Sequence, residues 1–333
     1  MPSLNDSFNQ LLHAINPDDD AVKYAQRAHE PVREFLESDE EFGQYTAGTF
    51  LYGSYARQTA VGDIKDVDIV VLTNFDPQST DDSPQKVLSR LKEALARYYE
   101  DPENPDYQRR SIRINDPLPD AKDVTMTLDI IPAVATGGDD GPLLVPDREV
   151  KEWIQSHPKG HMAHTTRLNR KEYSGGSFVP SVKLVKWWWK YQCSTRFPDV
   201  VRPQPKGFWL EVLTGECFDP AQSRWADHFT RFLESALDRY RASSQVPELP
   251  DPGLSGQNIK TGMTLAEFRA FVGVAEWSLD IAGQARATED PAEGARLWRK
   301  LFGTCFPRQE DDGAAPKILH LRRDDIPKPW GNQ

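Results

Sequence analysis

The apolar positions in the first part of the chain follow helical and extended periods in turn. Residues 22–37 and 83–101 place apolar side chains three or four apart, which is the spacing of an amphipathic helix. Around them lie short runs rich in β-branched and other apolar residues, each typical of a strand: 49–53, 67–73, 109–114 and 124–134. This order predicts a small mixed sheet backed by helices.

The second part of the chain follows the helical period. A stretch rich in Gly, Asp and Pro at 136–146 indicates a loop or domain boundary before it. The expected helices lie at 180–193, 207–218, 220–241, 264–286 and 290–302. We therefore predict an α+β protein with a mixed-sheet catalytic lobe at 1–145, a helical lobe at 146–307 and a flexible tail at 308–333.

Composition narrows the class of protein. The chain has 333 residues, of which 27% are charged, and a net charge of −11. This is globular usage, and the acidic balance argues against a long nucleic acid as a partner. Three cysteines far apart in the sequence predict neither a disulfide framework nor a cysteine zinc site. Because no run reaches the ~20 apolar residues that span a bilayer and no signal peptide is recognised, we expect a cytoplasmic protein.

Two aspartates stand at the head of the strand expected at 67–73. Asp66 and Asp68 point the same way, because side chains along a strand alternate between faces. Like charges this close repel unless a cation lies between them, and Mg²⁺ favours carboxylates together with substrate phosphates. Asp129, inside an apolar strand, is the candidate third ligand of a two-metal site. An unpaired charge there would be costly, so Asp129 requires a compensating partner.

A Gly-Ser pair precedes these aspartates in the sequence GSYARQT. Gly53 allows the backbone to approach a ligand closely, and Ser54 with the amides that follow can bind phosphate. Each feature alone has an ordinary explanation: a turn, a solvated strand end or, for Asp129, a core ion pair with an arginine such as Arg113. Together and in this order, they favour a site that holds a nucleoside triphosphate against metal-binding carboxylates.

These residues resemble the signature of the polymerase-β-like nucleotidyltransferases: Gly-Ser, a Gly-Thr pair, Asp-x-Asp and a distant third aspartate. Gln58 departs from the pattern where many members have glycine, whereas Thr59 follows it. Later segments resemble the CD-NTases, the cyclic oligonucleotide synthases of CBASS antiphage defence, clade D in particular: VKLVKWWWKY, KGFWLEVL and LWRKLFGTCFP. The resemblance runs from about residue 21 to residue 307.

The resemblance implies a mixed-sheet lobe and a helical lobe with the active site in the cleft between them. It implies that Asp66, Asp68 and Asp129 bind two Mg²⁺ ions, for which Mn²⁺ can substitute. It also implies that Gly53 and Ser54 hold the donor triphosphate.

Three cationic residues are further candidates for nucleotide binding. Lys186 occupies the place of a lysine that contacts phosphate in related enzymes, and its ordinary explanation is a solvated lysine on a core helix. Lys183 lies one turn earlier on that helix. Arg57 follows the Gly-Ser turn and is a candidate phosphate neighbour.

The implied activity joins nucleoside triphosphates, with ATP expected, into a cyclic di- or trinucleotide and releases pyrophosphate. A ribose hydroxyl attacks an α-phosphate, and Asp129 is expected to accept the hydroxyl proton. The alternatives are a non-cyclising nucleotidyltransferase that modifies RNA, a protein or a small molecule, and an inactive member that only binds nucleotides. Some relatives require a HORMA-type activator protein and others act alone, which the sequence does not decide.

A histidine-rich stretch has two interpretations. His157, His161 and His164 could share one face of a helix and bind zinc. However, Pro158 and Gly160 argue against a regular helix there, and no cysteine is near. We therefore favour an ordinary role for these histidines.

Two other motifs stay open. The tryptophans at 187–189 cannot all point one way on a helix, so we expect at least one ring to face the cleft or an interface and most of the stripe to lie in the core. The arginines of the strand at 109–114 either position substrate or lie exposed on an alternating strand. The sequence does not choose between these two roles.

Overall fold

A computed structural model describes residues 4–115, 117–118, 126–138, 140–200, 203–259 and 261–309. The chain divides into two compact units. The sheet unit comprises Pro17–Arg167 and Pro252–Gln257. The helical unit comprises Met1–Asn16, Leu168–Asp251 and Asn258–Gln333.

The observed boundary differs from the one predicted at residue 145. The strands β6 (Leu143–Asp147) and β7 (Glu152–Ser156) extend the sheet past it. The helix α1 (Asn5–Ile15) belongs to the helical unit, where it packs on two helices. The strand β6 was not predicted from the sequence, because its proline and the glycines before it indicate a loop. Of the predicted tail, residues 310–333 lie outside the described residues.

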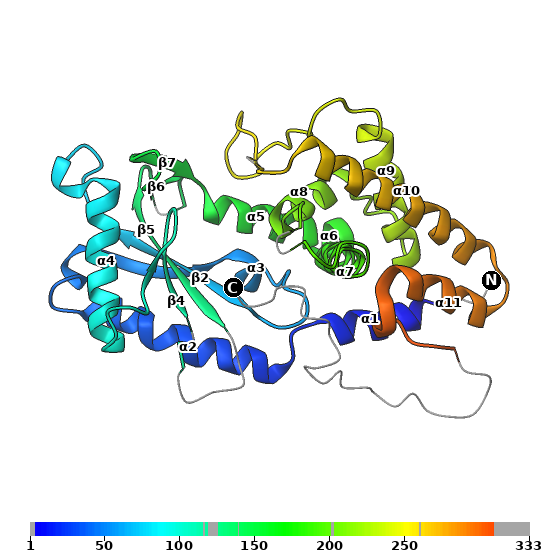
Figure 1. Ribbon diagram of the computed structural model, residues 1–333, viewed down its shortest axis with the longest axis horizontal. Helices are drawn as coiled ribbons and strands as arrows, with labels where there is room; N and C mark the ends of the chain where they lie inside the picture. Colours follow the sequence, from blue (N-terminus) through cyan, green and yellow to red (C-terminus); the bar gives the residue numbers. More distant parts are fainter. Residues whose placement is uncertain are drawn as a thin grey trace. The chain divides into compact units, whose positions relative to one another are not determined.

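One mixed sheet of seven strands forms in the described part of the chain (Figure 1). Its main path runs in the order β1 (Thr46–Tyr52), β2 (Asp66–Thr73), β5 (Thr127–Ala135), β4 (Ile112–Asn115) and β3 (Asp106–Tyr107). β2 and β5 are parallel, whereas the other paired strands are antiparallel. The four strands expected from the sequence are present, although the one expected at 109–114 begins only at Ile112.

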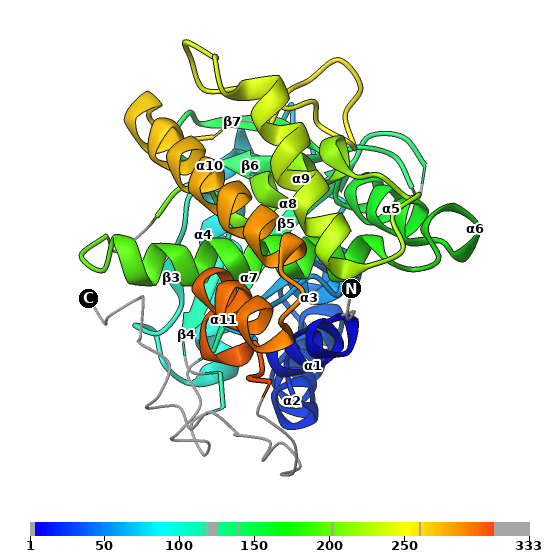
Figure 2. The same cartoon turned by 90° about the vertical axis from the view of Figure 1, so that its right-hand side faces the viewer.

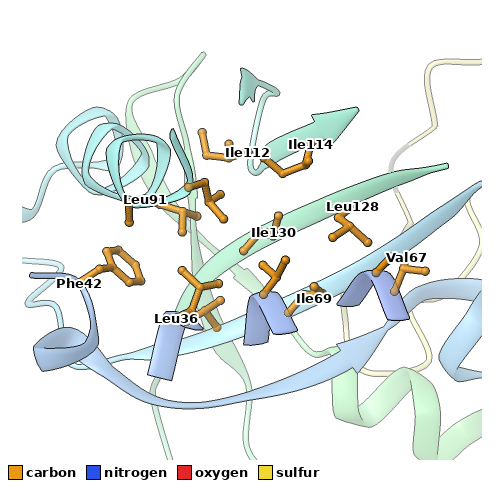
Figure 3. Close-up of a cluster of buried hydrophobic side chains, with 14 of the residues drawn as sticks. Leu36, Phe42, Val67, Ile69, Leu91, Ile112, Ile114, Leu128 and Ile130 are labelled. Carbon is orange, nitrogen blue, oxygen red and sulfur yellow. The ribbon is translucent and has the colours of Figure 1, made fainter. Parts of the chain in front are cut away.

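One face of the sheet is covered by the two amphipathic helices that the sequence predicts, α2 (Asp19–Ser38) and α4 (Pro84–Tyr99). Asp18 caps α2 by accepting a hydrogen bond from the Ala21 amide at 2.7 Å. Figure 3 shows Leu36 of α2 against Ile69 and Ile130 of the sheet, all fully buried. Each such side chain contributes about 1.5–3 kcal/mol when buried, so this face is the main core of the sheet unit.

The helical unit is built from helices that the sequence largely predicts. They are α1, α6 (Lys171–Ser174), α7 (Phe178–Arg196), α8 (Gly207–Cys217), α9 (Trp225–Tyr240), α10 (Leu265–Ala287) and α11 (Pro291–Phe302). Figure 2 shows α10 beside α9 and α11, against which it packs. Within the described residues, no helix combines the length and apolar character needed to cross a bilayer.

The three consecutive tryptophans of α7 are all buried, which confirms that this stripe belongs to the core. Trp187 Nε1 donates to the Phe302 carbonyl at 3.0 Å. Trp188 Nε1 donates to Ser278 Oγ at 2.9 Å. The two rings therefore reach different helices, as the rotation between consecutive helical residues requires.

The helix α5 (Pro158–Asn169) corrects one expectation. Pro158 and Gly160 were expected to prevent a regular helix. Pro158 instead takes the first helical position, where a backbone N–H has no partner within the helix. Position 160 requires a glycine, because a Cβ there would lie 2.5 Å from His157 Nδ1 and clash with that ring. The proline and glycine thus start the helix and make room for the preceding ring.

Candidate active site

One row of residues crosses the sheet in register: Tyr52, Asp68, Asp129 and Arg113. Tyr52 is paired with Asp68 on the antiparallel side, and Asp68 with Asp129 on the parallel side. Asp66 lies two residues before Asp68 and faces the same way. The structure therefore brings the three predicted carboxylates to one face of the sheet, opposite the face that α2 and α4 cover.

Asp129 forms a two-pronged ion pair with Arg113. Arg113 Nε donates to Oδ1 of Asp129 at 3.1 Å, and Nη2 donates to Oδ2 at 2.7 Å. Asp129 is only 8% exposed, so this pairing offsets the cost of removing its charge from water. The hydrogen bond to Asp129 in turn raises the pKa of Arg113. The ion pair between Asp129 and Arg113, which was one of two explanations that the sequence offered for Asp129, is thus present.

Asp68 lies next to both of the other carboxylates. Burial, followed by the negative charges of Asp66 and Asp129, raises the pKa of Asp68 to about 7. The guanidinium groups of Arg57 and Arg113 oppose this shift. Because like charges disfavour its ionised form, the Asp68 carboxylate would be relieved by a cation bound nearby.

The chemistry of these donors fits a divalent cation that prefers oxygen ligands. Mg²⁺ takes carboxylate oxygens together with substrate phosphates, and three carboxylates face the same side here. Among the described residues, no three His, Cys, Asp or Glu side chains already stand in a metal-binding arrangement. Both oxygens of Asp129 are engaged by Arg113, so a metal held by all three aspartates requires Asp129 to share or exchange this partner.

The Gly-Ser turn is pressed against Asp68. Gly53 opens the short helix α3 (Gly53–Ala56) with a φ of +78°, and a Cβ there would lie 1.8 Å from Asp68 Oδ2. Glycine alone tolerates both this contact and this backbone conformation. Ser54 follows in the same short helix. The turn predicted to hold phosphate therefore lies directly against a predicted metal ligand.

Gln58 keeps the turn despite its departure from the family pattern. Its φ of 58° is a left-handed conformation that glycine adopts freely, which explains why many members have glycine there. The Gln58 amide donates to the Tyr55 carbonyl at 3.0 Å, and the Thr59 amide to the Ser54 carbonyl at 2.9 Å. Gln58 thus adopts the left-handed conformation within a hydrogen-bonded turn.

Gly53→Ala is expected to lower turnover by about a hundredfold, because its methyl group would displace the Asp68 carboxylate. Gly48→Ala is the matched control, since Gly48 lies in the preceding strand β1, also has a positive φ (+142°) and has nothing within 4 Å of its Cβ position. Steady-state kinetics of the two variants measure the difference. Equal losses in both would show that backbone strain, and not the contact with Asp68, is responsible.

The two candidate lysines lie on α7 in the helical unit. Lys186 is 8% exposed, and its Nζ donates to Glu211 Oε2 of α8 at 3.0 Å, so the explanation as a solvated lysine is wrong. Lys183 donates to Asn16 Oδ1 at 2.7 Å. Burial, followed by the charge of Lys186, lowers the pKa of Lys183. Glu211 was not predicted as a partner of this lysine, although a single acid inside the apolar run GFWLEVL was a signal for it.

The arginines at the start of the 109–114 run have a structural contact. Arg109 Nε and Arg110 Nε donate to Asp147 Oδ2 at 2.7 and 2.9 Å. Asp147 is fully buried at the end of β6. These ion pairs join the segment before β4 to β6, whereas Arg113 of the same run reaches Asp129.

The three histidines make separate contacts. His161 Nδ1 lies 2.8 Å from Tyr52 Oη. His157 places its two ring nitrogens 2.6 and 2.8 Å from backbone carbonyl oxygens. His164 Nδ1 lies 3.3 Å from Arg167 Nη2 on the next turn. Among the described residues, the three side chains form no shared metal site.

The chain is similar to characterised proteins along most of its length. Residues 1–169 match the family model described as the Second Messenger Oligonucleotide or Dinucleotide Synthetase domain. The chain is 32% identical over 319 residues to the cyclic AMP-AMP-AMP synthase of Acinetobacter sp. (strain ATCC 27244 / 9458), covering 92% of this chain and 87% of the relative. It is 28% identical over 359 residues to the cyclic AMP-AMP-GMP synthase of Enterobacter hormaechei subsp. hoffmannii (strain UCI 50), covering 91% and 92%.

Solved structures share the fold. The structure of E. coli MS115-1 CdnC with ATP matches with a TM-score of 0.70 and 18% identity, covering 91% of this chain and 98% of that chain. The same protein in the CdnC:HORMA-deltaN complex matches with a TM-score of 0.70 and 17% identity over the same shares. At this identity the likeness establishes the fold, and it confirms the predicted α+β, polymerase-β-like architecture.

Proposed function

The chain belongs to the CD-NTase family of cyclic oligonucleotide synthases, and on this premise we propose that it converts ATP into a cyclic trinucleotide second messenger. The family makes the chain a nucleotidyltransferase that forms cyclic oligonucleotides. The names of both relatives describe a ring of three nucleotides with at least two AMP units, which supports ATP as the main substrate. We place the product in bacterial antiphage signalling of the CBASS type.

The observation that carries this proposal is the contact of the Gly-Ser turn with the row of carboxylates. Gly53 leaves no room for a side chain beside Asp68, and Asp68 is in register with Asp129. A triphosphate held by this turn would meet the carboxylates directly. Ser54 and Arg57 complete the proposed donor site, because one is in the turn and the other follows it.

The proposed reaction forms a bond from a ribose hydroxyl oxygen to the α-phosphorus of a nucleoside triphosphate. The bond from that phosphorus to the bridging oxygen breaks, and pyrophosphate leaves with the electron pair. Asp129 is proposed to accept the hydroxyl proton. The step repeats on the linear intermediate until its own hydroxyl closes the ring.

The family generally depends on a divalent metal, which when bound lowers the pKa of the attacking hydroxyl and neutralises phosphate charge. We propose a pair of Mg²⁺ ions, for which Mn²⁺ can substitute, with Asp66, Asp68 and Asp129 as ligands. Arg113 would then keep Asp129 oriented on its strand. The family pattern also supports Lys186 as a phosphate contact, and Lys183 is a further candidate because it lies one turn earlier on α7. Both assignments stay predictions.

We expect the purified chain to convert labelled ATP, in the presence of Mg²⁺, to a small product that resists phosphatase. A cyclic product has no terminal phosphate, which is why phosphatase cannot remove its label. Mass spectrometry of the resistant product identifies ring size and base content. The variant Asp66→Asn with Asp68→Asn is the matched control and should form no product.

Two other results would change the proposal. Extension of an added RNA without a resistant product would identify the non-cyclising alternative. A wild-type chain that binds ATP and forms no product alone is tested again with a HORMA-type protein, because CdnC was solved in complex with HORMA-deltaN. Absence of product with and without that protein would support an inactive, nucleotide-binding member.

A further inference from the structure

Arg57 is held in a defined orientation behind the Gly-Ser turn. The residue is only 8% exposed, and its guanidinium carbon lies 5.1 Å from the ring centre of Tyr52. A guanidinium is attracted to the negative face of an aromatic ring and lies along it. Tyr52 is in register with Asp68 on the neighbouring strand, so the ring that Arg57 lies over is on the same face of the sheet as the carboxylates. The Tyr52 ring therefore supports the Arg57 guanidinium on one side.

The Tyr52 ring is in turn fixed at its hydroxyl end. Tyr52 Oη lies 2.8 Å from Nδ1 of His161, which is 6% exposed on α5. The two ring centroids are 6.0 Å apart. A buried hydrogen bond between two aromatic side chains restricts the rotation of both rings. If one partner is removed, the polar atom of the other stays buried without a hydrogen bond, which costs free energy. His161 thus restrains the Tyr52 ring at its hydroxyl end.

A segment distant in the sequence closes over His161. A Cβ on Gly253 would lie 2.7 Å from His161 Cδ2 and 2.9 Å from the His157 carbonyl oxygen. The Gly253 carbonyl itself lies 2.6 Å from His157 Nδ1. The backbone at Gly253 therefore packs closely against the His161 ring and leaves no room for a larger residue at position 253. His161 is confined by Gly253 and bonded to Tyr52.

We propose that His161 and Tyr52 are positioning residues that hold the Arg57 guanidinium against the donor triphosphate. The order of contacts runs from Gly253 through His161 and Tyr52 to Arg57. This inference rests on the proposed function, which assigns the Gly-Ser turn to the triphosphate. Its consequence is that the affinity for the donor ATP depends on the hydrogen bond between His161 and Tyr52, because these two side chains orient the Arg57 guanidinium.

The test compares His161→Leu and Tyr52→Phe, because each removes the hydrogen bond and keeps a side chain of similar volume. Each is expected to raise the KM for ATP about fivefold, the effect of one hydrogen bond, with kcat changed less than about twofold. The double variant should raise KM no further, because the two side chains share one bond. In an Arg57→Gln background, neither change should raise KM again.

Two more variants separate positioning from packing. His161→Asn keeps a polar group near the position of Nδ1 and should restore most of the ATP affinity. Gly253→Ala keeps every polar group, displaces the His161 ring and should raise KM as His161→Leu does. His164→Asn, the same substitution one turn along α5, is the matched control and should leave KM unchanged.

Direct binding of ATP, measured by calorimetry with Ca²⁺ in place of Mg²⁺, separates this inference from the proposed function. A wild-type chain that binds no ATP overturns both. If wild type binds ATP and forms product while the KM values of His161→Leu and Tyr52→Phe stay at the wild-type value, only the inference fails. Additive effects in the double variant, or a lower Tm with an unchanged KM, would also overturn it.

Discussion

Asp68→Asn is expected to lower nucleotide joining by about a thousandfold or more and, without metal, to make the protein more stable at neutral and higher pH. Activity is lost because an amide is a poor ligand for a divalent cation. Stability rises because the variant no longer buries a carboxylate, and no longer holds it next to two other carboxylates. Burial, then Asp66 and Asp129, raises the pKa of Asp68 to about 7, so its ionised form is disfavoured in the folded protein.

The pH window follows from the direction of this shift. The folded protein holds the Asp68 proton more tightly than the unfolded chain, whose carboxyl has an ordinary pKa of 3.8. The associated stability is therefore present below about pH 4 and is lost as pH rises through about 7. We expect Asp68→Asn to exceed wild type by about 1–3 kcal/mol in the free energy of unfolding at about pH 8, with no difference at about pH 4.

Denaturant unfolding with a chelator, with and without added Mg²⁺, measures this effect independently of activity. Mg²⁺ should stabilise wild type and leave Asp68→Asn unchanged, because binding to the folded state alone raises stability. Asp63→Asn is the matched control, since Asp63 is exposed in the loop before β2. If the metal-free Asp68→Asn protein were less stable than wild type at pH 8, or Mg²⁺ stabilised both equally, the metal assignment would be wrong.

Lys186→Met is expected to lower the free energy of unfolding by about 3–5 kcal/mol. The change leaves the Glu211 carboxylate, which is 3% exposed, without its cation at 3.0 Å. A buried charge that loses its partner keeps the full cost of its removal from water. Lys190→Met on the same helix is the matched control, because Lys190 is half-buried over the ring of Trp187 and should cost less than about 1 kcal/mol.

Combining Lys186→Met with Glu211→Leu separates the two roles of this lysine. The double variant replaces the pair with apolar side chains of similar size and should recover most of the lost stability. If it folds and binds ATP as wild type does, Lys186 is structural and its phosphate role is wrong. A folded double variant with weakened ATP binding would support the phosphate contact. Urea unfolding and calorimetry provide the two readouts.

Much of the fold could be predicted because local patterns decide it. The helical spacing of apolar residues at 22–37 predicts α2, and the Ser-Pro start of 83–101 predicts α4. Both signals are independent of what the helices pack against. The strand at 143–147 was not predicted, because its proline and the glycines before it indicate a loop, although it pairs with β5 as a local antiparallel hairpin. The helical start at Pro158 was misjudged for a related reason. A proline is disruptive inside a helix and favourable at its first position, and only the observed boundary distinguishes the two.

The sequence by itself determined which kinds of group make up the candidate site. Gly53 and Ser54 precede the aspartates, and alternation along the strands predicts that the carboxylates share one face. Only the tertiary structure decided their partners. Arg113 neutralises Asp129, Glu211 neutralises Lys186, and His161 holds Tyr52. The physical reason is that alternation along a strand is local, whereas a buried charge or hydroxyl is satisfied by whichever side chain the fold brings within hydrogen-bonding distance.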